Sequence, residues 1–219
     1  MLRAKGFTLL EVLIASGLCL LLVGLFLGVL GPTLRATGRN SARISLQQSA
    51  LLALNRISKE VQASCVSGLG ILQPQGNADP TVLSIHRIAD VVNTSPASRA
   101  FESQLIVYSY VPGSHRIRRR LWPEPGLGET TLDGLLEPPT ANLALRPEPR
   151  SLLYFAQNPG PREQILVGQV RSFTVRSKSL PPEVTPPLNL TLELEGDMPG
   201  SSQPYRFELS QSLSPRNSE

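Results

Sequence analysis

The segment from Gly6 to Leu30, GFTLLEVLIASGLCLLLVGLFLGVL, limits the possible folds of this chain more than any other. Glu11 is its single charged residue. Because about 20 consecutive apolar residues in a helix are enough to cross a bilayer, the segment predicts one membrane-spanning helix. Arg3 and Lys5 precede it, and positive charge beside a span favours the cytoplasmic side. We therefore predict a cytoplasmic N-terminus and a C-terminal domain across the membrane.

Glu11 is the feature that an ordinary membrane anchor leaves without a role. A carboxylate inside a transmembrane helix is energetically costly, so its presence predicts a partner of opposite charge. Cleavage after Gly6 would give Phe7 a new amino group at the head of the same helix. In an assembly, Glu11 of one subunit would then meet the amine of a neighbouring subunit.

The sequence GFTLLEVLIA, preceded by a short basic leader, resembles the processing site of type IV pilins and type II secretion pseudopilins. In that family a membrane peptidase cuts after the glycine and N-methylates the new first residue. The resemblance places the cleavage between Gly6 and Phe7, the methyl group on Phe7, and the assembly glutamate at Glu11.

A secretory signal peptide and a simple membrane anchor both fit the N-terminal segment less well. A secretory signal peptide has an apolar core of about 7–15 residues and a small-residue exit such as A-x-A. The core here is longer, carries Glu11 and ends in LGPTLRATG. A simple membrane anchor accounts for the length and the flanking charges but leaves Glu11 unpaired.

Glycine and proline interrupt the apolar segment near its end. Glycine and proline are the poorest helix formers, and Pro32 also deprives the Gly28 carbonyl of its usual donor. We therefore predict a helix break in the membrane at Gly28, Gly31 and Pro32. The family resemblance implies that this region partly unwinds when subunits pack into a filament. Close helix packing through Gly24 and Gly28 is another use of these small residues, and it is compatible with the first.

Beyond Pro32 the spacing predicts that the helix resumes and becomes amphipathic. Arg35, Arg39 and Arg43 share one face, which we interpret as solvated, or paired with acidic neighbours in a filament, rather than as a ligand site. An apolar stripe follows at helical spacing, formed by Leu46, Ala50, Leu54, Ile57 and Val61. The glycines of SGLG predict that the helix ends near Cys65.

After Gly70, short runs of branched and aromatic residues alternate with Pro, Gly, Asn and Ser, which predicts strands separated by loops. The candidate strands are Thr81–Ile88, Gln104–Val111, Ile117–Leu121, Leu152–Phe155, Gln164–Arg176, Asn189–Glu195 and Tyr205–Leu213. The stretch LIVYSYVPGSHRIRRRLW predicts a hairpin whose turn is Pro112-Gly113-Ser114. The strict alternation of LNLTLELE predicts that one of its faces is buried.

The second half of the chain narrows the resemblance. ILVGQVRSFTVRS, the alternating strand and the terminal YRFELSQSLSPRN are similar to the J-type minor pseudopilins and the W-type minor pilins. The resemblance implies an α+β, pilin-like fold: a long N-terminal transmembrane-plus-amphipathic helix packed on a C-terminal antiparallel β-sheet domain. The predicted organisation is a leader at 1–6 removed by prepilin peptidase, a helix at 7–66 with its transmembrane part at 7–30, and a globular β-rich domain at 67–219.

Residues that carry catalytic chemistry are scarce. His86 and His115 lie far apart near the ends of predicted strands, and we interpret both as structural or surface residues. Cys19 and Cys65 are too far apart along a continuous helix to pair, and we interpret Cys65 as a free thiol or an incidental surface residue. We therefore predict that the protein is not an enzyme and has no catalytic residues, metal site or cofactor.

The basic run from Arg116 to Arg120 is the remaining candidate for a binding surface. Arg118 and Arg120 share one face of a strand and Arg119 points to the other, so we interpret the run as a charged sheet edge that discourages aggregation. The nearby aromatic residues that base stacking would need are Tyr108, Tyr110 and Trp122. Nucleic acid is therefore the less favoured partner.

The function that the resemblance implies is that of a minor pilin or pseudopilin, a structural subunit that helps to initiate or cap a type IV pilus or a type II secretion pseudopilus. The implied partners are prepilin peptidase, other minor subunits, the major subunit, the inner-membrane assembly platform and membrane lipid. The implied location is the bacterial inner membrane, with the C-terminal domain periplasmic or extracellular. The alternative is a membrane-anchored pilin-like domain that binds DNA or a surface at a pilus tip.

Overall fold

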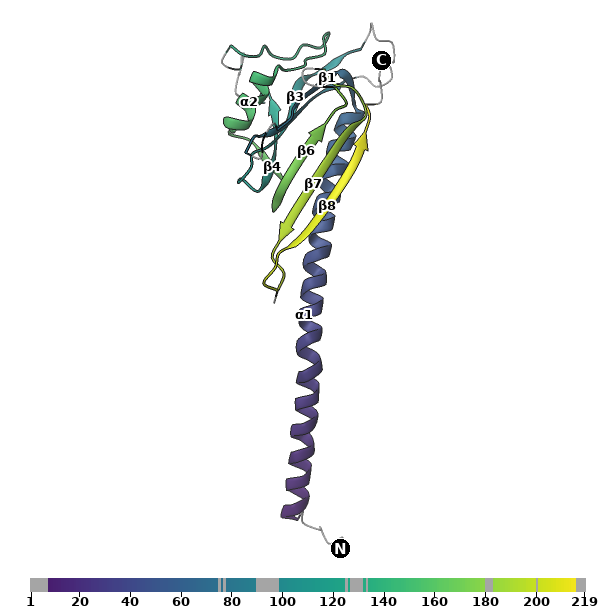
Figure 1. Ribbon diagram of the computed structural model, residues 1–219, viewed down its shortest axis with the longest axis vertical. Coiled ribbons are helices and arrows are strands. Elements are labelled where there is room, and N and C mark those ends of the chain that lie inside the picture. Colours follow the sequence, from purple (N-terminus) through teal and green to yellow (C-terminus); the bar gives the residue numbers. More distant parts are fainter. Residues whose placement is uncertain are drawn as a thin grey trace.

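A long helix, α1 (Leu9–Gln62), dominates the computed structural model, which describes residues 8–74, 76, 78–89, 99–124, 126, 132, 134–179, 183–199 and 201–215. Figure 1 shows the first half of α1 projecting away from the rest of the molecule, while a β-rich domain packs against one side of the second half. The predicted α+β fold, with a long N-terminal helix packed on antiparallel sheets, is confirmed.

The larger sheet is fully antiparallel and follows the chain order β1-β2-β3-β4-β5. Its strands are β1 (Ser64–Leu72), β2 (Thr81–Ile88), β3 (Phe101–Tyr110), β4 (Arg116–Trp122) and β5 (Gln164–Gly168). The predicted β3–β4 hairpin is confirmed, with Tyr110 opposite Ile117. Gly113 supplies the positive φ of 84° that the tight turn needs.

The smaller sheet contains β6 (Val170–Arg176), β7 (Leu188–Gly196) and β8 (Tyr205–Leu213) in that order. The alternation predicted for β7 is confirmed, because its leucines are buried while the intervening polar residues are not. At the end of β7, Gly196 lies so close to α1 that an added Cβ would come within 2.8 Å of the Leu46 side chain. Any larger residue here would therefore force the Leu46 side chain to shift.

The main core lies between α1 and both sheets. The predicted apolar stripe of α1 is buried there against leucines of β7 and aromatic residues of β3 and β6. A second core covers the opposite face of the larger sheet, where Leu152 and Phe155 of α2 (Pro149–Gln157) pack against Trp122. The larger sheet is therefore covered by a helix on each face, as Figure 1 shows.

Two of the predicted strands differ from the structure. Leu152–Phe155 belongs to helix α2, because Pro149 is suited to a helix start and the buried Leu152, Phe155 and Ala156 have helical spacing. Gln164–Arg176 is not one strand: Gln169, with a φ of 58°, separates β5 from β6 and sends the chain into the other sheet.

The end of α1 also differs from the prediction. The helix ends at Gln62, and the segment from Ser64, including the glycines expected to stop it, forms β1. Gly68 lies where an added Cβ would come within 2.8 Å of the His86 carbonyl oxygen on β2. Gly68 therefore allows the backbone of β2 to approach closely rather than ending a helix.

Candidate functional site

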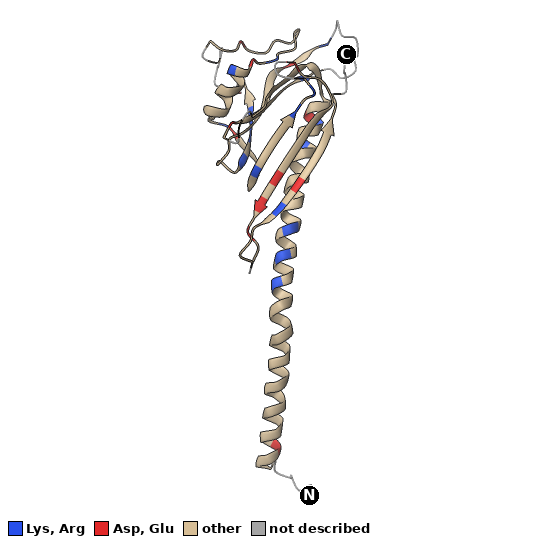
Figure 2. Cartoon of the chain, in the orientation of Figure 1, with Lys and Arg blue, Asp and Glu red and all other residues tan. Residues whose placement is uncertain are grey.

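The segment of α1 from residue 9 to residue 34, called here the apolar segment, is the strongest candidate for a functional surface. All of its leucine, valine, isoleucine and phenylalanine side chains are exposed, on every side of the helix. By length and composition, α1 is able to cross a membrane. Figure 2 shows that this stretch is almost without charge between one acidic residue near its start and the basic residues where the domain begins.

Glu11 lies in the first turn of α1, where it forms a capping box with Thr8. The Thr8 amide and hydroxyl donate to the Glu11 carboxylate at 2.9 and 3.0 Å, and the Glu11 amide donates to the Thr8 hydroxyl at 3.4 Å. The carboxylate therefore helps to start the helix while remaining exposed to a further partner. The predicted cleavage and methylation residues, Gly6 and Phe7, lie outside the described residues.

The break predicted at Gly28, Gly31 and Pro32 is not present in the isolated chain, because α1 runs through Pro32 without interruption. Among the described residues, no other part of the chain lies close enough to the glycines to form hydrogen bonds with backbone groups that a break would free. The continuous helix, which satisfies these groups itself, is therefore the least costly state. An added Cβ at Gly24, Gly28 or Gly31 would meet nothing within 4 Å. These glycines leave a smooth surface that another helix can approach closely. The unwinding expected in a filament stays a prediction.

The other end of α1 carries a buried carboxylate, Glu60. The Arg119 guanidinium donates to it at 3.0 Å through Nη2, and the buried Tyr108 hydroxyl also donates to it. Tyr108 and Arg119 face each other across β3 and β4. Burial and the Glu60 charge raise the pKa of the Tyr108 hydroxyl. This cluster fixes the rotation of α1 against the larger sheet.

The basic strand is not a sheet edge, because β4 lies between β3 and β5; that interpretation is wrong. Arg119 and Arg120 are buried, and Arg120 forms an ion pair with the buried Glu124 at 3.1 Å. Arg118 pairs with Glu163 at 3.7 Å on the same side of the strand. The three aromatic residues considered for base stacking, Tyr108, Tyr110 and Trp122, are all buried. This strand therefore offers no stacking surface to nucleic acid.

The histidines and the second cysteine have structural contacts. His86 is fully buried: its Nε2 lies 2.7 Å from the Glu102 carbonyl, and its Nδ1 accepts from the Leu145 amide at 2.9 Å. Burial lowers the pKa of His86, which matches a neutral ring in this position. Cys65 is buried beside Phe101, so the surface interpretation of this residue is wrong, and both cysteines are free.

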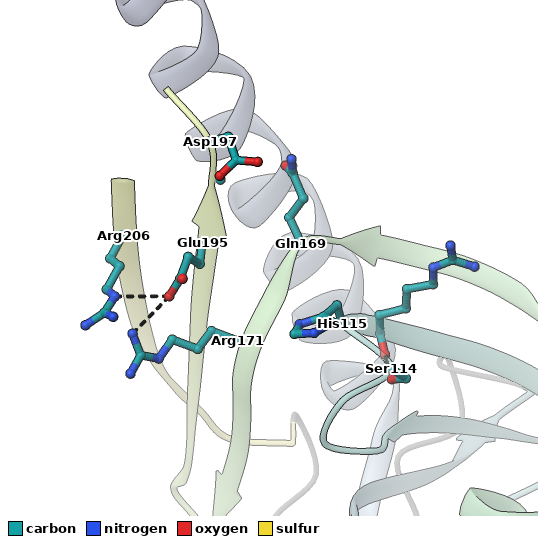
Figure 3. Close-up of a pocket in the computed structure, with 9 residues that line it drawn as sticks. Ser114, His115, Gln169, Arg171, Glu195, Asp197 and Arg206 are labelled. Atoms are coloured by element: carbon teal, nitrogen blue, oxygen red, sulfur yellow. Dashed lines mark hydrogen bonds and ion pairs between the residues drawn. The ribbon is translucent and has the colours of Figure 1, made fainter. Parts of the chain in front are cut away.

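A polar groove of about 840 Å³ lies where the two sheets meet (Figure 3). Arg171 and Arg206 both donate to Glu195, at 2.9 and 3.0 Å. Ser114 and His115 lie at the rim, but the Ser114 hydroxyl donates to the Val111 carbonyl and the His115 ring contacts the Val170 carbonyl. Their polar atoms thus stabilise the turn. Among the described residues, no group of His, Cys, Asp and Glu is placed to hold a metal ion.

The arginine face predicted as solvated is only partly so. Arg35 is exposed, whereas Arg39 is half-buried and its Nε donates to the Pro199 carbonyl at 3.0 Å. The Arg43 guanidinium lies 4.9 Å from the centre of the Tyr205 ring. Two of the three arginines therefore join α1 to the β7–β8 loop, residues 197–204, and the start of β8.

Sequence reasoning did not identify the Glu60 cluster or the contacts of Arg39 and Arg43. One signal for Glu60 was present, because it lies three residues after Ile57 on the apolar face of α1. A charged residue on such a face predicts a buried partner. Arg119 itself, distant in sequence, carries no comparable signal.

Comparison with known proteins gave no match to a family model, a curated protein or a solved structure.

Proposed function

We propose that this chain is a minor pilin or pseudopilin, a structural subunit that helps to initiate or cap a type IV pilus or a type II secretion pseudopilus. The observation that carries the proposal is the division of α1 into an apolar segment exposed on all sides and a segment packed into a β-rich domain. A subunit of this shape can present its apolar segment to lipid, or to the helices of other subunits in a filament core. Its β-rich domain then stays outside that core.

The proposed sequence of events begins in the bacterial inner membrane, with the N-terminus in the cytoplasm and the domain on the periplasmic or extracellular side. Prepilin peptidase cuts between Gly6 and Phe7 and N-methylates Phe7. The subunit then leaves the lipid and joins other minor subunits and the major subunit at the assembly platform. These steps are supported by the GFTLLEVLIA motif and by an apolar segment able to cross a membrane.

Glu11 is the proposed assembly contact. Its carboxylate is exposed near the start of α1, and its intramolecular hydrogen bonds come from Thr8 alone among the described residues. A neighbour displaced along the filament axis brings its own Phe7 amine to this carboxylate. Two opposite charges in an apolar environment attract strongly, so the pair would set the stagger between subunits.

The test uses the full chain expressed in its native membrane with its partner subunits. We expect the Glu11→Ala variant to be cleaved and to stay membrane-embedded, yet to fail to co-purify with those subunits. The matched control is Glu208→Ala, which removes an exposed carboxylate on β8 and should leave co-purification unchanged. Wild-type assembly by Glu11→Ala would remove Glu11 from this role.

Processing is tested on the same membranes by mass spectrometry of the intact chain. The expected mature chain begins with N-methylated Phe7. Replacement of Gly6 by a bulky residue should block cleavage without affecting insertion, because the apolar segment is unchanged. An uncut wild-type chain would contradict the proposal.

A further inference from the structure

The three arginines Arg35, Arg39 and Arg43, called here the arginine stripe of α1, begin directly after Leu34, the last residue of the apolar segment. Figure 2 shows these basic residues gathered on the helix where the domain begins. The stripe therefore lies at the boundary between the apolar segment and the domain. Positive charge at this boundary favours an anionic ligand that lies close to a membrane surface.

The structure forms a small pocket at this boundary. Its volume is about 210 Å³, and its lining residues are Arg39, Arg43, Met198, Ser201, Gln203, Pro204 and Tyr205. Arg39 is held by the Pro199 carbonyl, and Arg43 is held over the Tyr205 ring. The pocket thus combines two positioned guanidinium groups with apolar surface from Met198 and Pro204.

The depth of the pocket follows from helix geometry. From Glu11, the helical rise of 1.5 Å per residue places Arg35 about 36 Å and Arg39 about 42 Å along the axis. A bilayer has a hydrocarbon core of about 30 Å and a total thickness of about 40–45 Å with its headgroups. With Glu11 at one boundary of the core, Arg35 lies among the headgroups of the other leaflet. Arg39 and Arg43 follow at about 42 and 48 Å, so the pocket that they line lies directly above this headgroup layer on the side of the domain.

We propose that this pocket binds the phosphate of an anionic phospholipid in the leaflet on the side of the domain. Guanidinium groups form strong, directional hydrogen bonds to phosphate oxygens. The Ser201 hydroxyl and the Gln203 amide supply further polar groups, while Met198 and Pro204 suit the glycerol and acyl carbons. A bound lipid would fix the depth of α1 and join the membrane surface to the β7–β8 loop. The inference rests on the membrane-crossing part of the proposed function.

The test is a titration of the full chain in detergent micelles with phosphatidylglycerol or phosphatidylcholine, read by native mass spectrometry. We expect tighter binding of phosphatidylglycerol. Each arginine near an anionic lipid surface contributes about fivefold, so Arg39→Gln with Arg43→Gln should weaken that binding about 25-fold. The corresponding double lysine variant keeps the charges and should retain most of it. Arg176→Gln, an exposed arginine at the far end of β6, is the matched control and should change nothing.

Three outcomes would overturn the site: equal affinity for both lipids, unchanged affinity in the double glutamine variant, or displacement of the lipid by inorganic phosphate at equal concentration. If the double variant instead loses binding to acidic partner subunits while keeping lipid selectivity, the stripe is a protein contact. Alkaline extraction of native membranes tests the span separately. Release of the wild-type chain would overturn membrane insertion, whereas loss of selectivity with intact insertion overturns the lipid site alone.

Discussion

The two ends of α1 belong to one uninterrupted helix but depend on different surroundings. In the apolar segment, Leu22 keeps 62% of its surface exposed, whereas Leu54 in the packed segment, residues 46–61, keeps 1%. Burial of a leucine side chain contributes about 1.5–3 kcal/mol, so the packed segment obtains its stability inside the chain. Among the described residues, the apolar segment has no comparable burial.

The carboxylates near the two ends show the same contrast. Glu11 is exposed and makes local bonds with Thr8, whereas Glu60 is buried and binds Arg119 and Tyr108 from another part of the chain. Loss of Glu11 should therefore affect association between subunits. Loss of Glu60 should affect the fold of a single subunit.

The largest effect on folding should follow Glu60→Ala, which leaves the Arg119 charge buried without its partner. Removal of one member of a buried ion pair typically costs about 3–5 kcal/mol of unfolding free energy. Denaturant unfolding followed by the fluorescence of Trp122, the single and fully buried tryptophan, measures it. Replacing Glu60 and Arg119 together by leucine should recover most of the loss. A Glu60→Ala domain as stable as wild type would break the comparison.

Leu54→Ala should lower the unfolding free energy by about 2–5 kcal/mol, because it removes a buried side chain and leaves a cavity. Leu22→Ala is the matched change in the apolar segment, and it should leave the unfolding of the domain unchanged. The same fluorescence measurement compares them. Equal effects would mean that the two segments are not energetically separate.

Thr8→Ala removes the hydroxyl that caps α1. Loss of such a cap destabilises the first helical turn by about 0.5–2 kcal/mol. Amide hydrogen exchange in micelles should become faster near residues 9–12 and stay unchanged in the packed segment, and Thr8→Ser should restore slow exchange. Faster exchange throughout α1 would show that its two segments open together.

The smallest effect on the unfolding free energy should come from protonation of His86 as the pH falls. Because burial lowers its folded pKa below the ordinary 6.5, the unfolded chain binds the proton first. The contribution of neutral His86 to stability is therefore fully present above pH 6.5 and is lost as the pH decreases below that value. Unfolding measured from pH 7.5 downward should show this loss in wild type and in the His115→Gln control. His86→Gln should reduce the slope, and an unchanged slope would exclude His86 as its source.

Strong local patterns in the sequence were sufficient to predict much of the fold. Thr81–Ile88 and Tyr205–Leu213 agree with β2 and β8, and the turn at Gly113 agrees with the predicted hairpin. Leu152–Phe155 failed because a short apolar run fits a strand as well as a helix until its length is known. The prediction that Gly68 helps to end α1 failed because glycine is common both at helix ends and where two strands approach closely.

The candidate site was predictable only where a residue acts within its own segment. Glu11 was found because its charge stands alone in an apolar run, and the structure adds its bonds to Thr8. Arg119 was misjudged because its burial depends on which strand lies beside β4 and on the rotation of α1. Those are properties of long-range packing, which one strand cannot specify.

The junction between α1 and β1 has a mechanical consequence. Gln62 ends the helix and Ser64 begins the strand, with Ala63 alone between them. Tension applied to the N-terminal end of α1 should therefore pass directly into β1 of the larger sheet, and the Glu60–Arg119 ion pair should share the load. As long as α1 stays helical through Pro32, displacement of its N-terminal end should therefore move the domain with it.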